Sequence, residues 1–171
     1  MIPTPDQAEQ LPGHPLLEEF GAQLQQVPTP PGVRYWLLHD RYRPPARQAE
    51  AVANGTSNAQ YGQSAHSRWS GEGVAEPWAG AAIDVYPITD EGIVSNVVAH
   101  YQPIAELAAS YGLENLGAKY GWDWAHNQLS DWRDYPVLPD PNARTAAPPS
   151  LLGAGLVIGG ITYLVRSGVL S

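Results

Sequence analysis

The sequence contains no cysteine among its 171 residues. This absence excludes disulfide bonds, thiolate metal ligands and a cysteine nucleophile, so any metal ion must be held by His, Asp or Glu. Basic residues are also scarce, since 9 Lys and Arg stand against 17 Asp and Glu and give a formal net charge of -8. Because no run of Lys or Arg is present, a surface that follows a phosphate backbone has nothing to build on, and nucleic acid is not an expected partner.

The opening residues lack the basic start and the apolar core of a cleaved export signal. Residues 1–13 instead carry three prolines among polar residues, which predicts an N-terminal arm. The length of the chain suits one domain with tails, because it is too short for two domains with cores of their own. We therefore expect one domain over residues 14–134.

Hydrophobic spacing predicts the elements of this domain. Residues 14–27 and 96–113 carry apolar positions at helical spacing, with Pro103 near the first turn of the second helix. Residues 44–55 begin with prolines, continue with good helix formers and end in Asn-Gly, which predicts a third helix. The branched and aromatic runs at 33–42 and 81–88 predict two strands.

The C-terminal part has a different composition. Residues 135–150 contain five prolines in sixteen positions and predict a linker. Residues 151–165 then form an uncharged apolar run that shows no polar face, and we expect residues 151–171 to be a transmembrane tail with Arg166 near one interface. The alternatives are a buried C-terminal helix or a helix packed in an assembly, and Gly155 and Gly159 have the spacing that allows close self-association.

A small set of polar residues could carry chemistry. His66, Asp84 and His126 supply two imidazoles and one carboxylate, a common ligand set for catalytic zinc, which keeps its fourth position for water. Asp123 lies three positions before His126 and is a candidate general base. The alternative is structural: Asp84 as a strand-end cap, Asp123 as a turn residue and His126 as a packed histidine.

These residues match motifs in the order of a known family. The pattern SxHxxGxAxD is matched at its front by Ser64, Ala65 and His66 and at its back by Gly80, Ala82 and Asp84, and the later pattern of an acid, two residues and His is matched by Asp123 and His126. With the preceding segment 41–66, the chain resembles the zinc peptidases that include D-Ala-D-Ala carboxypeptidases and the L-alanyl-D-glutamate endopeptidases of phage endolysins. The resemblance covers about residues 14–130.

The sequence departs from the family pattern between the first two ligands. His66 and Asp84 are eighteen positions apart, eleven more than in the family, and Trp69 stands where the family has the glycine of HxxG. The inserted residues are rich in glycine and also contain proline, so we expect a loop that bulges outward without moving its ends. The second motif is also compressed, so Asp123 could align with a turn aspartate of the family; Glu114 or Asp131 is then the next candidate base.

The resemblance implies an α+β fold, in which a small antiparallel sheet is flanked by helices and holds a zinc site in a cleft. It implies that Zn²⁺ is bound by His66, Asp84 and His126 and activates a water molecule, that Asp123 and Arg43 are catalytic, and that Arg43, Ser64 and Trp124 contact substrate. Trp69 and Trp78 are further candidates to line the cleft. Ser64 is expected to orient His66 or its loop.

The implied substrate is the stem peptide of peptidoglycan, in phage lysis or entry. With the apolar tail, this predicts a protein anchored in a virion or bacterial envelope membrane. The alternative is a catalytically degenerate, tail-anchored structural or wall-binding protein.

Overall fold

A computed structural model describes residues 1–140 of the chain. The predicted transmembrane tail and most of the predicted linker lie outside the described residues. Within residues 1–140, none of the helices is both long enough and apolar enough to span a bilayer.

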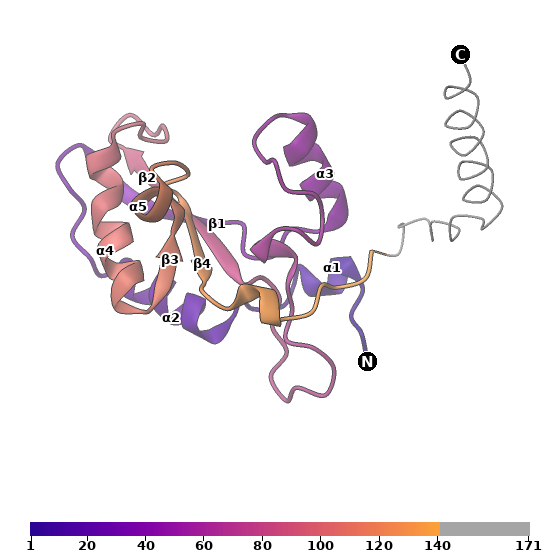
Figure 1. The fold of residues 1–171 in the computed structure, drawn as a ribbon. Coiled ribbons are helices and arrows are strands. Elements are labelled where there is room, and N and C mark those ends of the chain that lie inside the picture. Colours follow the sequence, from indigo (N-terminus) through magenta and orange to yellow (C-terminus); the bar gives the residue numbers. More distant parts are fainter. Residues whose placement is uncertain (141–171) are drawn as a thin grey trace, which may run out of the picture. The chain divides into compact units, whose positions relative to one another are not determined.

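The centre of the fold is a four-stranded antiparallel sheet with the strand order β1-β2-β4-β3 (Figure 1). Its longer strands, β1 (Val33–His39) and β2 (Ala82–Thr89), confirm the two strands predicted from composition. The other two, β3 (Leu113–Asn115) and β4 (His126–Leu129), were not predicted. Strands of three and four residues are too short to show a recognisable alternation of polar and apolar side chains.

Helices surround the sheet, so the mixed α and β architecture is confirmed. The predicted helices are α2 (Pro15–Leu24), α3 (Pro45–Ala53) and α4 (Gln102–Ser110), and each has a proline in its first turn. Two short helices, α1 (Pro5–Ala8) and α5 (Leu116–Tyr120), were not predicted. Single 3₁₀ turns lie at η1 (Ala65–Ser67), η2 (Val98–Tyr101) and η3 (Trp132–Asp134). The turn η2 directly precedes α4, which starts at Gln102 and has Pro103 in its first turn.

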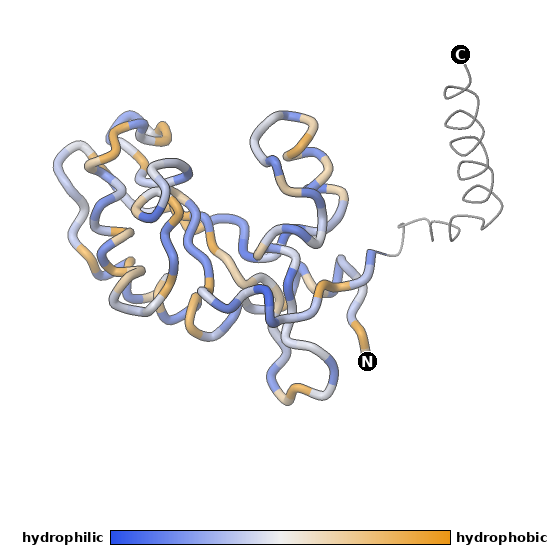
Figure 2. Tube along the Cα trace, viewed as in Figure 1, coloured by the Kyte–Doolittle hydropathy of each residue, from blue (hydrophilic) through white to orange (hydrophobic). Residues whose placement is uncertain are grey.

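One face of the sheet packs against α2 and α4. Leu17 and Phe20 of α2 and Ile104 of α4 are fully buried in one cluster with Ile83 and Val85 of β2. In Figure 2, hydrophobic residues recur along these helices between hydrophilic ones. Because successive strand residues point to opposite faces, the even-numbered residues of β2 that lie between and beside Ile83 and Val85 face away from these helices.

The compact unit is wider than the predicted 14–134 and comprises Met1–Asp140. At its start, Thr4 and Gln7 form a capping box that begins α1, and Ala8 is buried in a second small cluster. At its end, Leu138 is fully buried in that same cluster, and Val137 pairs with Arg68. The expected arm and the first residues of the expected linker are therefore parts of the domain.

The insertion between His66 and Asp84 projects as a closed loop. The Ala81 amide donates to the Ala65 carbonyl at 3.0 Å, and the Gly80 amide donates to the Arg68 carbonyl at 2.7 Å. Further out, Trp69 pairs with Ala79 across the loop. The two ends of the insertion therefore meet at its base, as expected, and the added residues do not separate the ligands.

Candidate metal centre

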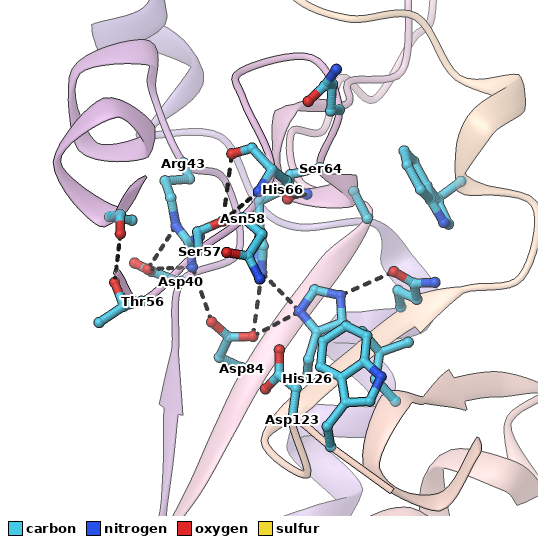
Figure 3. Close-up of a pocket in the computed structure, with 18 of the residues that line it drawn as sticks. Asp40, Arg43, Thr56, Ser57, Asn58, Ser64, His66, Asp84, Asp123 and His126 are labelled. Atoms are coloured by element: carbon cyan, nitrogen blue, oxygen red, sulfur yellow. Dashed lines mark hydrogen bonds and ion pairs between the residues drawn. The ribbon is translucent and has the colours of Figure 1, made fainter. Parts of the chain in front are cut away.

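The three predicted ligands come from three segments that meet on the sheet face opposite α2 and α4. His66 lies in η1, Asp84 on β2 and His126 at the start of β4. Asp84 and His126 are direct partners in the antiparallel register, so the pairing of β2 with β4 itself places their side chains together. Figure 3 shows the His66, Asp84 and His126 side chains converging.

The donor atoms of the cluster lie within hydrogen-bond distance of one another. Nε2 of His66 is 3.2 Å from Nδ1 of His126, and Oδ1 of Asp84 is 3.3 Å from the first nitrogen and 3.1 Å from the second. His66, Asp84 and His126 are 1%, 6% and 8% exposed. A buried His-Asp-His cluster of this spacing could hold a metal ion.

The outer nitrogen of each ring fixes which nitrogen carries the proton. Nδ1 of His66 lies 2.8 Å from the Arg41 carbonyl oxygen, and Nε2 of His126 lies 3.0 Å from Oε1 of Gln128. Both oxygens only accept hydrogen bonds, so both outer nitrogens donate. In the neutral rings, the two inner nitrogens therefore present lone pairs to each other and to the Asp84 carboxylate. Three acceptors that meet without a donor require a cation among them, either a proton or a metal ion.

The pKa shifts reflect the same demand for positive charge. Burial alone would raise the pKa of Asp84, but the charge of His66 and the hydrogen bond with His126 hold it far below its usual range. Burial alone would lower the pKa of His126, but the hydrogen bond and charge of Asp84 outweigh burial and leave that pKa raised. The carboxylate is therefore kept in the ionised form that a metal ligand needs.

Arg43 holds the second oxygen of Asp84 instead of facing open solvent. Its guanidinium donates to Oδ2 of Asp84 at 3.1 Å, to Oδ2 of Asp40 at 3.1 Å and to Oε1 of Gln48 at 3.3 Å. The side chain is 12% exposed. These bonds leave Oδ1 of Asp84 as the oxygen that faces the two imidazoles. The geometry therefore favours a positioning role for Arg43 over the predicted contact with a substrate carboxylate.

Gly80 supports His66 through the backbone of Arg41. Its φ of +92° lies in the left-handed region, and a Cβ added there would collide with the carbonyl carbon and oxygen of Arg41. That carbonyl accepts the Nδ1 proton of His66. The glycine of the predicted motif is thus required where the chain passes behind the first ligand.

A second supporting network was missed in the sequence. Gln128, which accepts from His126, donates through Nε2 to Oε2 of Glu114 at 3.1 Å, and Glu114 also pairs with Lys119. Gln128 and Glu114 are direct partners between β4 and β3. The His-x-Gln spacing, which puts both side chains on one strand face, is the signal that could have found Gln128.

The cluster opens into a pocket of about 1000 Å³. Its lining includes α3 with the polar loop that follows it on one side, and α5 with the start of β4 on the other. Asp123 lines this pocket, and Figure 3 shows its carboxylate beside Asp84 and His126. Partial burial removes hydration from the Asp123 carboxylate and raises its pKa, although the residue still reaches solvent. The charge of His126 opposes this shift, and the charge of Asp84 adds to it.

Ser64 and the tryptophans complete the comparison with the expected site. The Ser64 hydroxyl lines the pocket and accepts from the His66 amide at 3.3 Å, which agrees with an orienting role. Trp124 packs against the core and does not line the pocket, and neither do Trp69 and Trp78, which are buried. The neighbouring Trp122, which was not predicted, lines the pocket and is 58% exposed.

A comparison of the chain with protein-family models finds no match, and a search of curated protein sequences finds none either. The resemblance to the zinc peptidases therefore rests on the motif residues described above.

Proposed function

We propose that the protein is a zinc-dependent hydrolase of peptidoglycan stem peptides. The observation that carries the proposal is the convergence of two imidazole nitrogens and one carboxylate oxygen, 3.1 to 3.3 Å apart, in an open pocket. A catalytic metal site needs this combination, because the protein must supply the ligands and leave a position that solvent and substrate can reach.

The donor set fits zinc in kind and in spacing. Zinc accepts both imidazole nitrogens and carboxylate oxygens, and Zn–N and Zn–O bonds of about 2.0 to 2.2 Å imply donor separations of about 3.3 Å in a tetrahedron. The donor atoms of His66, Asp84 and His126 are 3.1 to 3.3 Å apart. Bound zinc would lower the pKa of a water ligand toward about 7 and polarise a carbonyl group.

The residues around the donor set have separate tasks in this proposal. Asp123, at the edge of the pocket, accepts a proton from the attacking water and returns it to the amine that leaves when the peptide bond breaks. Its raised pKa suits both transfers, because a carboxyl that is too acidic gives a proton but does not take one. Arg43 holds Asp84, and Gln128 holds His126, so the donor atoms stay in place through the reaction.

The substrate class is supported by the order of the motif residues and by the shape of the site. The front and back of SxHxxGxAxD and the acid-x-x-His motif occur in family order, and all three ligands of that pattern meet in space. The long insertion leaves their geometry intact because its ends meet at its base. A pocket of about 1000 Å³ has room for a peptide substrate.

The test is the digestion of purified peptidoglycan by the zinc-loaded full-length chain, with mass spectrometry of the released fragments. We expect new amino termini at one position of the stem peptide. Asp123→Asn, which preserves the shape of the side chain, should release none above background while it retains zinc. If the zinc-loaded wild type releases no fragment from walls of several compositions, the proposal is wrong and the wall-binding alternative stands.

The cellular setting is part of the proposal and rests on the sequence alone. An apolar run at 151–165 would tether the hydrolase to a virion or bacterial envelope membrane during phage entry or lysis. Flotation of the full chain with liposomes tests this. The chain that ends at Pro149 should remain in the soluble fraction, and equal behaviour of the two chains would contradict the tether.

A further inference from the structure

Two exposed aromatic rings lie together at the edge of the metal pocket. Tyr120 and Trp122 are 56% and 58% exposed, and both line the pocket that holds the predicted ligands. Their ring centroids are 6.2 Å apart and their planes differ by 20°, so the two rings lie nearly parallel in a stacked arrangement. We call this pair the aromatic platform.

The backbone is built to present this platform. Gly121, between the two rings, ends α5 in the left-handed conformation with a φ of +81°, and Asp123 on the other side of Trp122 also has a positive φ of +51°. A non-glycine residue in that region carries strain, so the turn is retained at a cost to stability. The turn makes Trp122 point outward while Trp124 packs inward.

Trp124 anchors the turn from below. It packs so closely on Gly117 of α5 that no Cβ fits there, and its carbonyl accepts from Nδ2 of Asn115 at 2.9 Å. The contacts of Trp124 therefore hold in place the turn that carries Tyr120 and Trp122. Exposed aromatic surface held in this way is unfavourable in water and favours a binding role.

The surroundings of the platform indicate an amphipathic ligand. The Lys119 ammonium lies 5.2 Å from the Tyr120 ring centroid and pairs with Glu114, and Asp123 adjoins Trp122 in the chain. A lipid or an apolar protein surface would strip water from these charges without replacing their hydrogen bonds. A pyranose ring suits both the aromatic rings and the charged groups beside them, because its C–H face stacks on the negative face of an aromatic ring and its hydroxyls form hydrogen bonds with polar neighbours.

We propose that Tyr120 and Trp122 are a sugar-binding subsite, which stacks a pyranose ring of the glycan strand beside the peptide bond to be cut. The inference rests on the proposed function, since the stem peptide is joined to the glycan at its first residue. Trp122 is adjacent to Asp123, and each further extended residue adds about 3.3 to 3.6 Å. A sugar on the platform therefore favours cleavage near the glycan end of the stem over cleavage of the distant D-Ala–D-Ala bond.

The first test is direct binding of a trisaccharide of N-acetylglucosamine to the full-length chain, followed by the indole N–H signals in NMR spectra. The indole signal that is absent from the spectrum of Trp122→Ala belongs to Trp122, and we expect the trisaccharide to shift this signal in the wild type in a saturable way. Binding should be roughly tenfold weaker in Trp122→Ala and in Tyr120→Ala. Tyr35→Ala is the matched control, because Tyr35 is 45% exposed on β1 and does not line the pocket. No saturable binding, or equal binding by all variants, would overturn the subsite.

The second test compares two substrates with the same peptide sequence, one with its sugar and one without. The quantity compared is kcat/KM for the sugar-bearing substrate divided by kcat/KM for the free peptide. We expect this ratio to fall about tenfold in Tyr120→Ala, a variant that keeps Trp122 beside Asp123. The Tyr35→Ala control should retain the wild-type ratio. An unchanged ratio in Tyr120→Ala would mean that the rings do not bind the sugar. If the wild type cuts neither substrate, the hydrolase proposal fails, and trisaccharide binding still decides the subsite.

Discussion

Replacing Gly80 by alanine should damage the metal site without touching a ligand. The residue has a φ of +92°, and its Cβ would collide with the Arg41 carbonyl group that accepts the His66 proton. Gly73, in the same loop, has a similar φ of +78° but nothing within 4 Å of its added Cβ. The pair of variants therefore shares the backbone strain and differs in the collision.

The expected magnitudes follow from these two contributions. The strained φ costs about 1 to 3 kcal/mol in both variants, and forced displacement of packed atoms costs Gly80→Ala about 1 to 3 kcal/mol more. Loss of an outer hydrogen bond to a metal-bound histidine lowers metal affinity about 10- to 100-fold. We therefore expect Gly73→Ala to bind zinc as the wild type does, and Gly80→Ala to bind it at least about tenfold more weakly.

Calorimetric titration of the metal-free protein with zinc measures the affinities, and thermal unfolding in the presence of a chelator measures the stabilities. Each 1 kcal/mol should shift Tm by about 2 to 4 °C for a chain of this size. If Gly80→Ala and Gly73→Ala have equal zinc affinities and equal Tm values, the Arg41 carbonyl does not position His66 and the reasoning is refuted.

Three further predictions concern the residues around the ligands. Gln128→Ala should weaken zinc binding about 10- to 100-fold, because His126 loses the hydrogen-bond partner that fixes its tautomer. Gln128→Glu can still accept the Nε2 proton of His126 and should bind zinc more tightly than Gln128→Ala; equal affinities of the two variants would remove Gln128 from the site. Asp123→Asn should keep stoichiometric zinc and lose about 10²- to 10⁴-fold in kcat/KM, and unchanged turnover would exclude Asp123 as the base. Because burial raises the pKa of Asp123 in the metal-free site, an NMR titration of the metal-free protein should show this carboxylate taking up its proton at a pH above the usual 3.9 or so; a midpoint at or below about 3.9 would contradict this.

The sequence predicted the His-Asp-His cluster better than it predicted the contacts that support the cluster. The apolar run around Asp84 indicated a strand, and the residue types and motifs around His66, Asp84 and His126 indicated a metal set, because these signals are patterns of residue type. The contact between Gln128 and Glu114 could not be found in this way. The two residues lie on strands of four and three residues, and their contact exists only after β3 pairs with β4.

Tertiary contacts also determine the surroundings of Arg43 and of the tryptophans. Arg43 contacts Asp84, which lies 41 positions away, as well as its chain neighbours Asp40 and Gln48, and the contact with Asp84 could not be read from the sequence. Trp122 and Trp124 flank Asp123 in the sequence, one position away on each side. The left-handed turn at Gly121 and the tight contact at Gly117 determine which of them faces the pocket.

The zinc content of the purified full-length protein and of the single alanine variants at His66, Asp84 and His126, measured by elemental analysis, tests the metal centre most directly. We predict one zinc per chain in the wild type and substoichiometric zinc in each variant, because each substitution removes one of the three donors that meet in the pocket. The Gly73→Ala variant, which leaves every donor and its partners in place, should retain one zinc per chain. Stoichiometric zinc in all three alanine variants, or none in the wild type after purification with added zinc, would contradict the assignment.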